Sequence, residues 1–168
     1  MDLPKRKLQR LRNYDYSQNG AYFVTICTHK RLCLFGQIKD KMLCLNDAGQ
    51  MVFNRFNEIP QFYSGIEIDQ FIVMPNHLHA ILMINHSGTT QGSFPTMALP
   101  GYIQRFKSLT TRLYIEGVKN GCYPPFDKKL WQKSYYDHII RSEKQYQKVS
   151  EYIQTNPLKW QEDKYFVV

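Results

Sequence analysis

The chain has few cysteines, and their spacing matches neither a zinc site nor a redox pair. The four are Cys27, Cys33, Cys44 and Cys122, and no two are separated by only two residues. A zinc knuckle is therefore not expected. Cys27 lies in a hydrophobic run and is expected to be a small buried residue. We expect free thiols and a reducing compartment.

Long apolar runs are also missing. No stretch approaches the roughly 18 consecutive apolar residues that a transmembrane helix needs. The charged beginning, residues 1–7, is followed by no apolar segment of the kind found in signal peptides. The sequence therefore predicts a cytoplasmic protein with no membrane partner.

Acidic side chains are scarce relative to basic ones. The chain has 14 Asp and Glu against 22 Lys and Arg, which gives a net charge of +8. A balance this basic favours a polyanionic partner, and nucleic acid is the commonest one. The 12 Tyr and 10 Phe offer rings on which unpaired bases could stack, although most of them must form the core. At 168 residues the chain is expected to be a single domain, 1–168.

Hydrophobic patterning predicts an α+β protein in which helices pack on an antiparallel sheet. Strands are expected at residues 22–28, 66–74 and 77–84, with the last two in the middle of the sheet, and a further extended segment at 131–140. Residues 32–38 and 41–45 are expected to pair as a hairpin. Loops are expected at 85–96 and 118–129, and residues 1–19 are expected to form a basic arm that carries Lys5, Arg6, Lys7, Arg10 and Arg12.

Three helices are expected from their start and stop signals. The first begins near Asp47 after the cap Asn46 and is stopped by Pro60. The second has proline 100 in its first turn and runs to about residue 117. The third runs from 143 to about 155, because Ser142 and Gln145 resemble a capping box and the residue before a proline avoids helical angles.

The most informative feature is a pair of histidines at the beginning of a buried run. His77 and His79 flank one leucine directly after the turn-forming Pro75 and Asn76. Strand side chains alternate between faces, so the two imidazoles point the same way. Burying both is costly unless something satisfies them. A divalent metal would do so, and the pair therefore predicts a metal site on the sheet.

The last helix supplies partners for this site. Tyr152 and Asn156 are four residues apart and so share a helix face. The amide oxygen of Asn156 is a good ligand for Mg²⁺ or Mn²⁺, and the Tyr152 hydroxyl beside it is placed to attack a phosphodiester. Spacing alone does not select Tyr152 among the tyrosines, and Tyr114, Tyr135 and Tyr136 are rivals.

A basic stripe on the second helix is the other candidate for contact with nucleic acid. Arg105 and Arg112 lie on the side opposite the apolar residues, with Lys107 beside them. Such a stripe is commonly a solvated helix face, but the net charge of the chain makes phosphate contact an equal alternative.

The segment His77-Leu78-His79 resembles the His-hydrophobic-His (HUH) signature of the single-tyrosine (Y1) transposases of the IS200/IS605 type. It is especially similar to their REP-associated branch, the RAYT proteins. Further matching blocks lie at residues 14–16, 20–25, 131, 136–141 and 152–157, so the resemblance covers nearly the whole chain. The last block has the form Tyr-x-x-x-Asn-Pro.

This resemblance implies a fold, a chemistry and a set of roles. The fold would be ferredoxin-like or RRM-like, His77 and His79 would bind the metal with Asn156, and Tyr152 would be the nucleophile. The implied function is metal-dependent cleavage and strand transfer of single-stranded DNA near hairpins through a 5′-phosphotyrosine. The REP-associated branch differs in oligomeric state from other members of the family, so the resemblance implies either a monomer or a homodimer. The setting would be a bacterial or archaeal cytoplasm, in association with the nucleoid.

Two other functions are compatible with the sequence. A sheet-based nucleic-acid-binding regulator could use a similar topology, with a structural histidine pair, although such domains typically carry aromatic residues there. A relaxase or replication initiator shares the histidine pair, although those proteins are usually larger.

Overall fold

The computed structural model describes residues 15–85 and 97–167. Most of the expected N-terminal arm, with all five of its cations, and most of the loop expected at 85–96 lie outside these ranges. The described strands are β1 (Gly20–Cys27), β2 (Gly36–Lys39), β3 (Met42–Leu45), β4 (Ile66–Met74), β5 (His77–Ile84) and β6 (Tyr136–Ile140). The described helices are α1 (Asp47–Asn57), α2 (Ile59–Phe62), α3 (Leu99–Lys119) and α4 (Glu143–Thr155), with 3₁₀ turns η1 (His29–Arg31) and η2 (Trp160–Glu162).

Four strands form the main sheet in the order β4-β5-β1-β6, and every neighbouring pair is antiparallel. With α1 after β1 and α3 after β5, this is the split βαβ arrangement of a ferredoxin-like fold. The prediction of an α+β fold with an antiparallel sheet is confirmed. Strands β2 and β3 form a separate two-stranded sheet that leaves the main one. Within the described residues, no helix carries an apolar stretch long enough to cross a bilayer.

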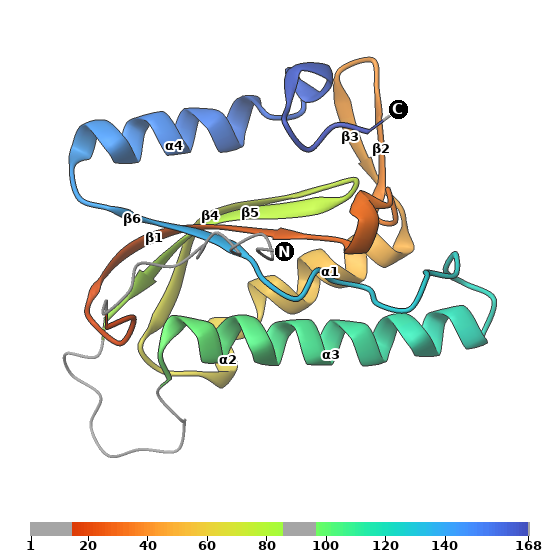
Figure 1. Cartoon of the computed structure of the whole chain (residues 1–168), viewed down its shortest axis with the longest axis horizontal. Helices are drawn as coiled ribbons and strands as arrows, with labels where there is room; N and C mark the ends of the chain where they lie inside the picture. Colours follow the sequence, from red (N-terminus) through yellow and green to blue (C-terminus); the bar gives the residue numbers. More distant parts are fainter. Residues whose placement is uncertain (1–14, 86–96, 168) are drawn as a thin grey trace, which may run out of the picture.

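The two faces of the sheet are covered by different helices (Figure 1). One face of β1 and β5 packs with Tyr102, Ile103 and Phe106 of α3 and with α1 in the main core. The other face contributes Phe23 and Ile81, which pack against Ile153 of α4. Alternation along β1 and β5 thus assigns every second residue to the α4 side. Since His77 and His79 alternate with Leu78 of the main core, they lie on the α4 side.

Helix α4 is fixed at its beginning and along its length. The Ser142 hydroxyl accepts a hydrogen bond from the backbone N–H of Gln145, as the capping signal predicts. Ser150 bonds to the side chain of Gln70 on β4 at 2.9 Å, and the hydroxyl of Tyr146 donates to Asp69 at 2.8 Å. These contacts set the position of the helix over the sheet.

Three sequence predictions about the elements are wrong. Strand β4 is an edge strand, not a central one: it carries the polar residues Glu67, Asp69 and Gln70 and a register shift between Ile68 and Gln70, features that suit an edge. Strand β1 takes the central place beside β5 because its last six residues are all buried.

Proline 60 does not stop the first helix. Helix α1 ends at Asn57, and Pro60 lies in the first turn of α2, where a missing N–H costs little. The extended segment expected at 131–140 is a strand only from Tyr136. Trp131 makes a single isolated bridge to Thr28, and its indole N–H donates to Thr110 of α3.

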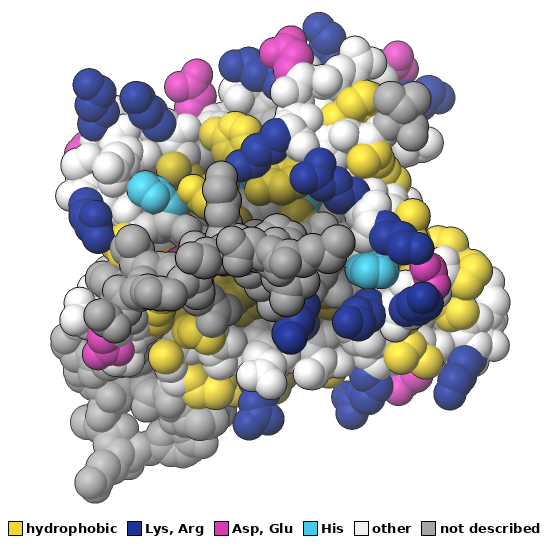
Figure 2. Space-filling view, viewed as in Figure 1, with side chains coloured by type: hydrophobic (Ala, Val, Ile, Leu, Met, Phe, Trp, Pro, Cys, Tyr) yellow, Lys and Arg dark blue, Asp and Glu magenta, His cyan; other side chains and the backbone are white. Residues whose placement is uncertain are grey.

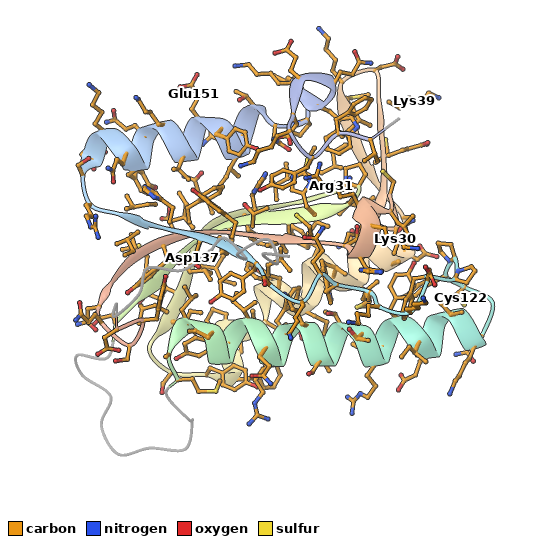
Figure 3. All side chains as sticks on the ribbon, in the orientation of Figure 1. Lys30, Arg31, Lys39, Cys122, Asp137 and Glu151 are labelled. Atoms are coloured by element: carbon orange, nitrogen blue, oxygen red, sulfur yellow. The ribbon has the colours of Figure 1, made fainter. Side chains whose placement is uncertain are left out.

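The chain after α4 returns across the end of the sheet (Figure 1). Trp160 and Tyr165 pack with Cys27 and Met74 in a small cluster that Ile38 of β2 borders. Arg31, labelled in Figure 3, donates a 2.8 Å hydrogen bond to the carbonyl of Lys164. The separate hairpin and η1 thus hold residues 160–166 against the α4 side of the sheet.

Candidate metal and nucleophile site

His77 and His79 meet on the sheet as the alternation predicts. Their ring centroids are 4.3 Å apart, and both side chains are completely buried. On the neighbouring strand β1 their register partners are Cys27 and Thr25. The pair thus lies on the face of the sheet that α4 covers.

The ring orientation of His77 is fixed by Asn76. The Asn76 amide nitrogen donates to the backbone carbonyls of Arg31 and Tyr165, so its oxygen faces the His77 ring. That oxygen only accepts, so His77 Nδ1, 2.8 Å away, must carry the proton. The lone pair of neutral His77 therefore lies on Nε2. His79 Nδ1 lies 2.8 Å from the hydroxyl of Thr25, which can donate or accept, and this contact holds the His79 ring in place.

Three buried polar atoms converge at the site without hydrogen bonds. Within the described part of the chain, His77 Nε2, His79 Nε2 and Asn156 Oδ1 have no partner. Burial lowers the pKa of both histidines below the usual 6.5, so both rings stay neutral near pH 7, and His77 keeps its lone pair on Nε2. Neutral imidazoles fixed through the other nitrogen are the form in which histidine binds metals.

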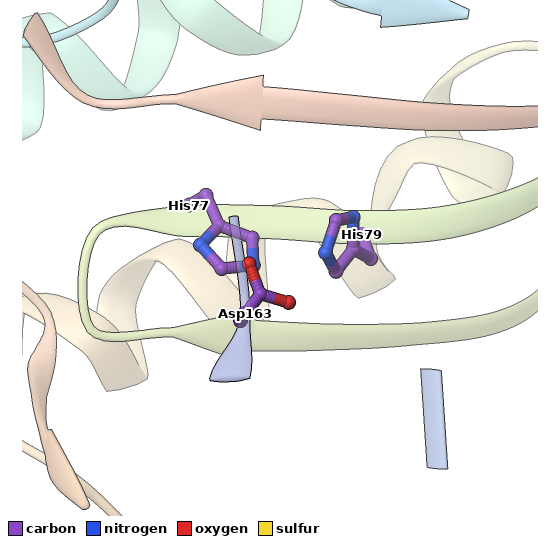
Figure 4. Close-up of side chains that lie close together, drawn as sticks. All are labelled: His77, His79 and Asp163. Atoms are coloured by element: carbon purple, nitrogen blue, oxygen red, sulfur yellow. The ribbon is translucent and has the colours of Figure 1, made fainter. Parts of the chain in front are cut away.

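A carboxylate that sequence reasoning missed completes the cluster. Asp163 follows η2, and one ligand atom from each of Asp163, His77 and His79 lies within 4.8 Å of the others (Figure 4). Two ligands about 2.1 Å from a cation, on opposite sides of it, are about 4.2 Å apart. The donor set of two imidazoles, an amide oxygen and a carboxylate therefore fits a divalent cation with small adjustments.

Asp163 is also the meeting point of the candidate nucleophile and the candidate amide ligand. Tyr152 donates its hydroxyl proton to Asp163 Oδ2 at 2.7 Å, and the Asn156 amide donates to the same oxygen. The other carboxylate oxygen accepts the backbone N–H of Tyr165 at 2.7 Å. No pattern in the sequence links Asp163 to Tyr152, because it lies 11 residues later in an irregular turn that shares no periodicity with α4.

Tyr152 packs against one member of the histidine pair, His79. Its ring centroid is 5.0 Å from that of His79 and 6.1 Å from that of Phe23. Burial, and secondly the hydrogen bond to Asp163, raise the pKa of the Tyr152 hydroxyl far above the usual 10. The phenol is therefore neutral in this structure, and the carboxylate beside it is placed to accept its proton.

The rival tyrosines take other places. Tyr114 is buried on α3 and donates to the carbonyl of Pro124, and Tyr135 packs in the main core. Tyr136 is exposed on β6, with its ring 6.3 Å from Phe23. Tyr165, which the sequence did not single out, is buried with its ring 4.7 Å from His77 and 5.6 Å from His79. Among the tyrosines in residues 15–85 and 97–167, Tyr152 and Tyr165 are thus the two whose rings contact the histidines.

The basic residues proposed from the sequence do not join this cluster. Arg105 and Arg112 are exposed on α3, which covers the opposite face of the sheet (Figure 1). Lys107 donates to the carbonyls of Gln132 and Ser134 at 3.0 Å each, so part of its hydrogen-bonding capacity is used within the protein. The arm cations Lys5, Arg6, Lys7, Arg10 and Arg12 lie outside the described residues.

With this fold and geometry established, comparison with known proteins assigns the chain to a class. The family model of IS200-like transposases matches residues 20–156. The chain therefore belongs to the IS200-like transposase family. A protein of Haemophilus influenzae (strain Rd) whose function is uncharacterized is 37% identical, over 96% of this chain and 93% of the relative.

Solved structures agree with this assignment at the level of the fold. A REP-associated tyrosine transposase bound to a REP hairpin superposes with a TM-score of 0.59 at 22% identity, over 90% of this chain and 73% of that one. A candidate transposase from Deinococcus radiodurans R1 superposes with a TM-score of 0.52 at 18% identity, over 88% and 96%. The first of these belongs to the branch that the sequence motifs resemble.

Proposed function

We propose that this chain cleaves single-stranded DNA next to a hairpin and transfers the cut strand, with Tyr152 as the nucleophile. The observation that carries the proposal is the convergence of the Tyr152 hydroxyl, the Asp163 carboxylate and two unpartnered imidazole nitrogens on one face of the sheet. Membership of a transposase family makes DNA the substrate class.

In this proposal His77, His79 and Asn156, joined by Asp163, hold Mg²⁺ or Mn²⁺. The bound cation would supply positive charge that neutralises a non-bridging oxygen of the scissile phosphate. Imidazole nitrogens in half of the donor set favour Mn²⁺ over Mg²⁺, which prefers an all-oxygen shell. Thr25 and Asn76 act on the ligands rather than on the substrate, because each contacts the Nδ1 atom of one histidine and so holds its ring in place.

The chemical step follows from the positions of Tyr152 and Asp163. As Tyr152 Oη attacks the phosphorus, its proton passes to Asp163 Oδ2, which already accepts it in a hydrogen bond. The O–P bond to tyrosine forms and the P–O3′ bond breaks. The leaving oxygen takes a proton from water, which leaves a 5′-phosphotyrosine and a free 3′-hydroxyl. A 3′-hydroxyl that attacks this ester reverses the step, so joining requires no ATP.

One chain contains every residue of the proposed site. His77 and His79 come from β5, Tyr152 and Asn156 from α4, and Asp163 from the segment after η2 of the same chain. This supports a tyrosine that acts in cis and an enzyme that works as a monomer, with a homodimer as the alternative. The hairpin in the REP-bound structure supports a hairpin as the partner DNA.

The test is covalent trapping. A labelled hairpin oligonucleotide with unpaired flanks is incubated with the full chain and Mn²⁺ or Mg²⁺, and a denaturing gel resolves any protein–DNA adduct. The expected result is an adduct whose phosphate maps to Tyr152 by peptide mass spectrometry. Tight binding without an adduct in either metal would reject the proposal and favour a non-catalytic regulator.

A further inference from the structure

A basic groove lies in the layer opposite the candidate site. It is formed by α3 and the chain that leads from residue 126 to β6, and its volume is about 650 Å³. Its lining has a single acidic residue, Glu116, against six cations, which are Lys107, Arg112, Lys119, Lys128, Lys129 and Lys133. Figure 2 shows Lys and Arg side chains gathered at the lower right, over the C-terminal half of α3.

The acid nearest to these lysines in sequence does not neutralise them. Asp127 pairs instead with Lys30 of η1. All of the groove cations except Lys107 are exposed. A groove in which cations outnumber acids in this way raises the local positive potential and attracts a polyanion.

One wall of the groove is held rigidly. Leu130 and Trp131 are buried beneath it, and the Leu130 carbonyl accepts the N–H of His29 at 2.8 Å. Gln132 donates its N–H to the carbonyl of Cys27 at 2.9 Å, and Lys107 clamps the carbonyls of Gln132 and Ser134. Lys133, between the clamped residues, is therefore presented from a fixed backbone, so binding costs little ordering of the loop.

The aromatic residues of the groove are not free to stack on bases. Trp131 is buried against Phe35 and Phe106, and Phe126 packs on Tyr114. Grooves that take unpaired nucleic acid combine cations with accessible rings. Cations without such rings fit a partner that offers phosphates alone, as the outside of a duplex does.

The groove leads to the catalytic face around the edge strand β6. Lys133 is three residues before Tyr136, a span of at most about 10 Å of extended chain. Tyr136 is exposed, and its ring lies beside Phe23, which in turn contacts Tyr152. The Lys164 ammonium lies 5.1 Å from the Tyr136 ring centroid. An accessible aromatic ring and a cation thus lie together on this side, and this is the combination that binds unpaired bases.

We propose that the groove of α3 and residues 126–133 binds the phosphate backbone of the duplex stem of a DNA hairpin. The unpaired strand then passes the edge of the sheet at Tyr136 and reaches the site on the other face. This assignment rests on the proposed function for its DNA substrate. In this assignment Arg112, which lies on α3 and lines the groove, contacts the stem.

The test compares two double variants on three DNA probes. Lys129→Gln/Lys133→Gln removes two cations from the groove, and Lys144→Gln/Lys148→Gln removes two exposed cations from α4 as the matched control. The probes are a hairpin with an unpaired tail, the same hairpin with blunt ends, and the tail alone. Affinities are measured as a function of salt, because each lost phosphate contact lowers the slope of log K against log salt by about 0.9.

We expect the groove variant to lower the salt slope by about 1.8 on both hairpins, with a loss of affinity on the order of tens of fold at 0.1 M salt. Binding of the tail alone should not change, and the control should match the wild type. An equal loss of affinity for the tail alone would show that the groove binds unpaired DNA. An equal loss of affinity in the control variant would show that binding depends on the overall positive charge of the chain and not on the groove. Either outcome overturns the assignment.

The same probes separate this proposal from the proposed function. Stem binding that depends on the groove, without any adduct in Mn²⁺, would reject the nuclease and leave the groove assigned. An adduct at Tyr152, with stem binding indifferent to the groove variant, would reject the groove alone. A wild-type chain that binds none of the three probes would reject both.

Discussion

The hydroxyl of Tyr152 donates a 2.7 Å hydrogen bond to the carboxylate of Asp163, which also receives the amide of Asn156. The proposed nucleophile and the proposed amide ligand are therefore joined by one acidic group that lies beside both histidines. A cation at this position would compete with Tyr152 and Asn156 for the Asp163 carboxylate, whose Oδ2 atom both side chains now contact. In the proposed function, occupation of the metal site would thus be coupled through Asp163 to release of the Tyr152 hydroxyl.

Replacement of the nucleophile should abolish the chemistry alone. Tyr152→Phe removes one oxygen, so no adduct should form, while hairpin affinity stays within about twofold of the wild type. The lost hydrogen bond to Asp163 should lower the free energy of unfolding by about 1 kcal/mol. Trapping gels and urea unfolding measure the two effects.

Two variants control this experiment. Tyr146→Phe removes an equivalent hydroxyl from the same helix, one that donates to Asp69 at 2.8 Å away from the histidine pair. Tyr165→Phe removes the hydroxyl of the other tyrosine that contacts the pair. Both should retain the adduct. If Tyr165→Phe loses it and Tyr152→Phe does not, the nucleophile has been assigned to the wrong tyrosine.

Metal binding should stabilise the folded chain. With a metal concentration 100 times the dissociation constant, the gain is about 2.7 kcal/mol for a site that exists only in the folded state. Mn²⁺ should therefore raise the unfolding midpoint of the wild type but not that of His77→Gln/His79→Gln. Asn156→Ala should need more Mn²⁺ for the same shift. An equal shift in the histidine variant would place the metal elsewhere.

Asp163 should contribute to both metal and nucleophile. Asp163→Asn keeps the shape of the side chain but removes its charge, so we expect Mn²⁺ affinity to fall by at least about 10- to 100-fold, the range seen when groups that only support the ligands are changed. The same change removes a cause of the raised pKa of Tyr152, so that pKa should fall. Calorimetry measures the Mn²⁺ affinity. Ultraviolet titration of the tyrosines, from which the same titration of Tyr152→Phe is subtracted, measures the pKa of Tyr152.

Stability in the absence of metal should decrease in mild acid. Burial places the folded-state pKa of His77 and His79 below the unfolded value of about 6.5, so the unfolded chain binds protons first as the pH falls. The stability is complete above pH 6.5 and declines below it, by up to about 1.4 kcal/mol per pH unit for each histidine.

Urea unfolding between pH 7.5 and 5 gives the slope, and His77→Gln/His79→Gln should flatten it. A wild-type slope that the double variant leaves unchanged would show that other groups govern the acid sensitivity. Saturating Mn²⁺ should also shift the decline to lower pH, because protons and metal compete for the same lone pairs.

The sequence predicted the parts of the site that lie on regular elements. Alternation in β5 placed His77 and His79 on one face, and helical spacing placed Tyr152 and Asn156 together, because both periods are local properties of the backbone. Asp163 was missed because its position depends on the path of the chain after α4, which packing with Trp160, Tyr165 and the β2–β3 hairpin determines. No local period encodes such a path.

The same distinction explains the errors in the fold. Both strands of the 66–84 hairpin are hydrophobic, but only the pairing of β1 with β5 and β6 makes β4 an edge. The basic stripe of Arg105 and Arg112 was recognised on its helix, but the layer in which that helix lies was not. Patterns along one element predict which side of that element is buried, whereas the arrangement of elements decides which residues meet.

The alternation of β5 also limits how this protein can vary over evolution. A substitution at Leu78 changes the main core below the sheet, and the histidines above it keep their places. A residue gained or lost in the turn at Pro75 and Asn76 would instead invert the whole strand and turn both imidazoles into the apolar core. Lineages of this chain should therefore accumulate substitutions in β5 far more readily than changes in its length.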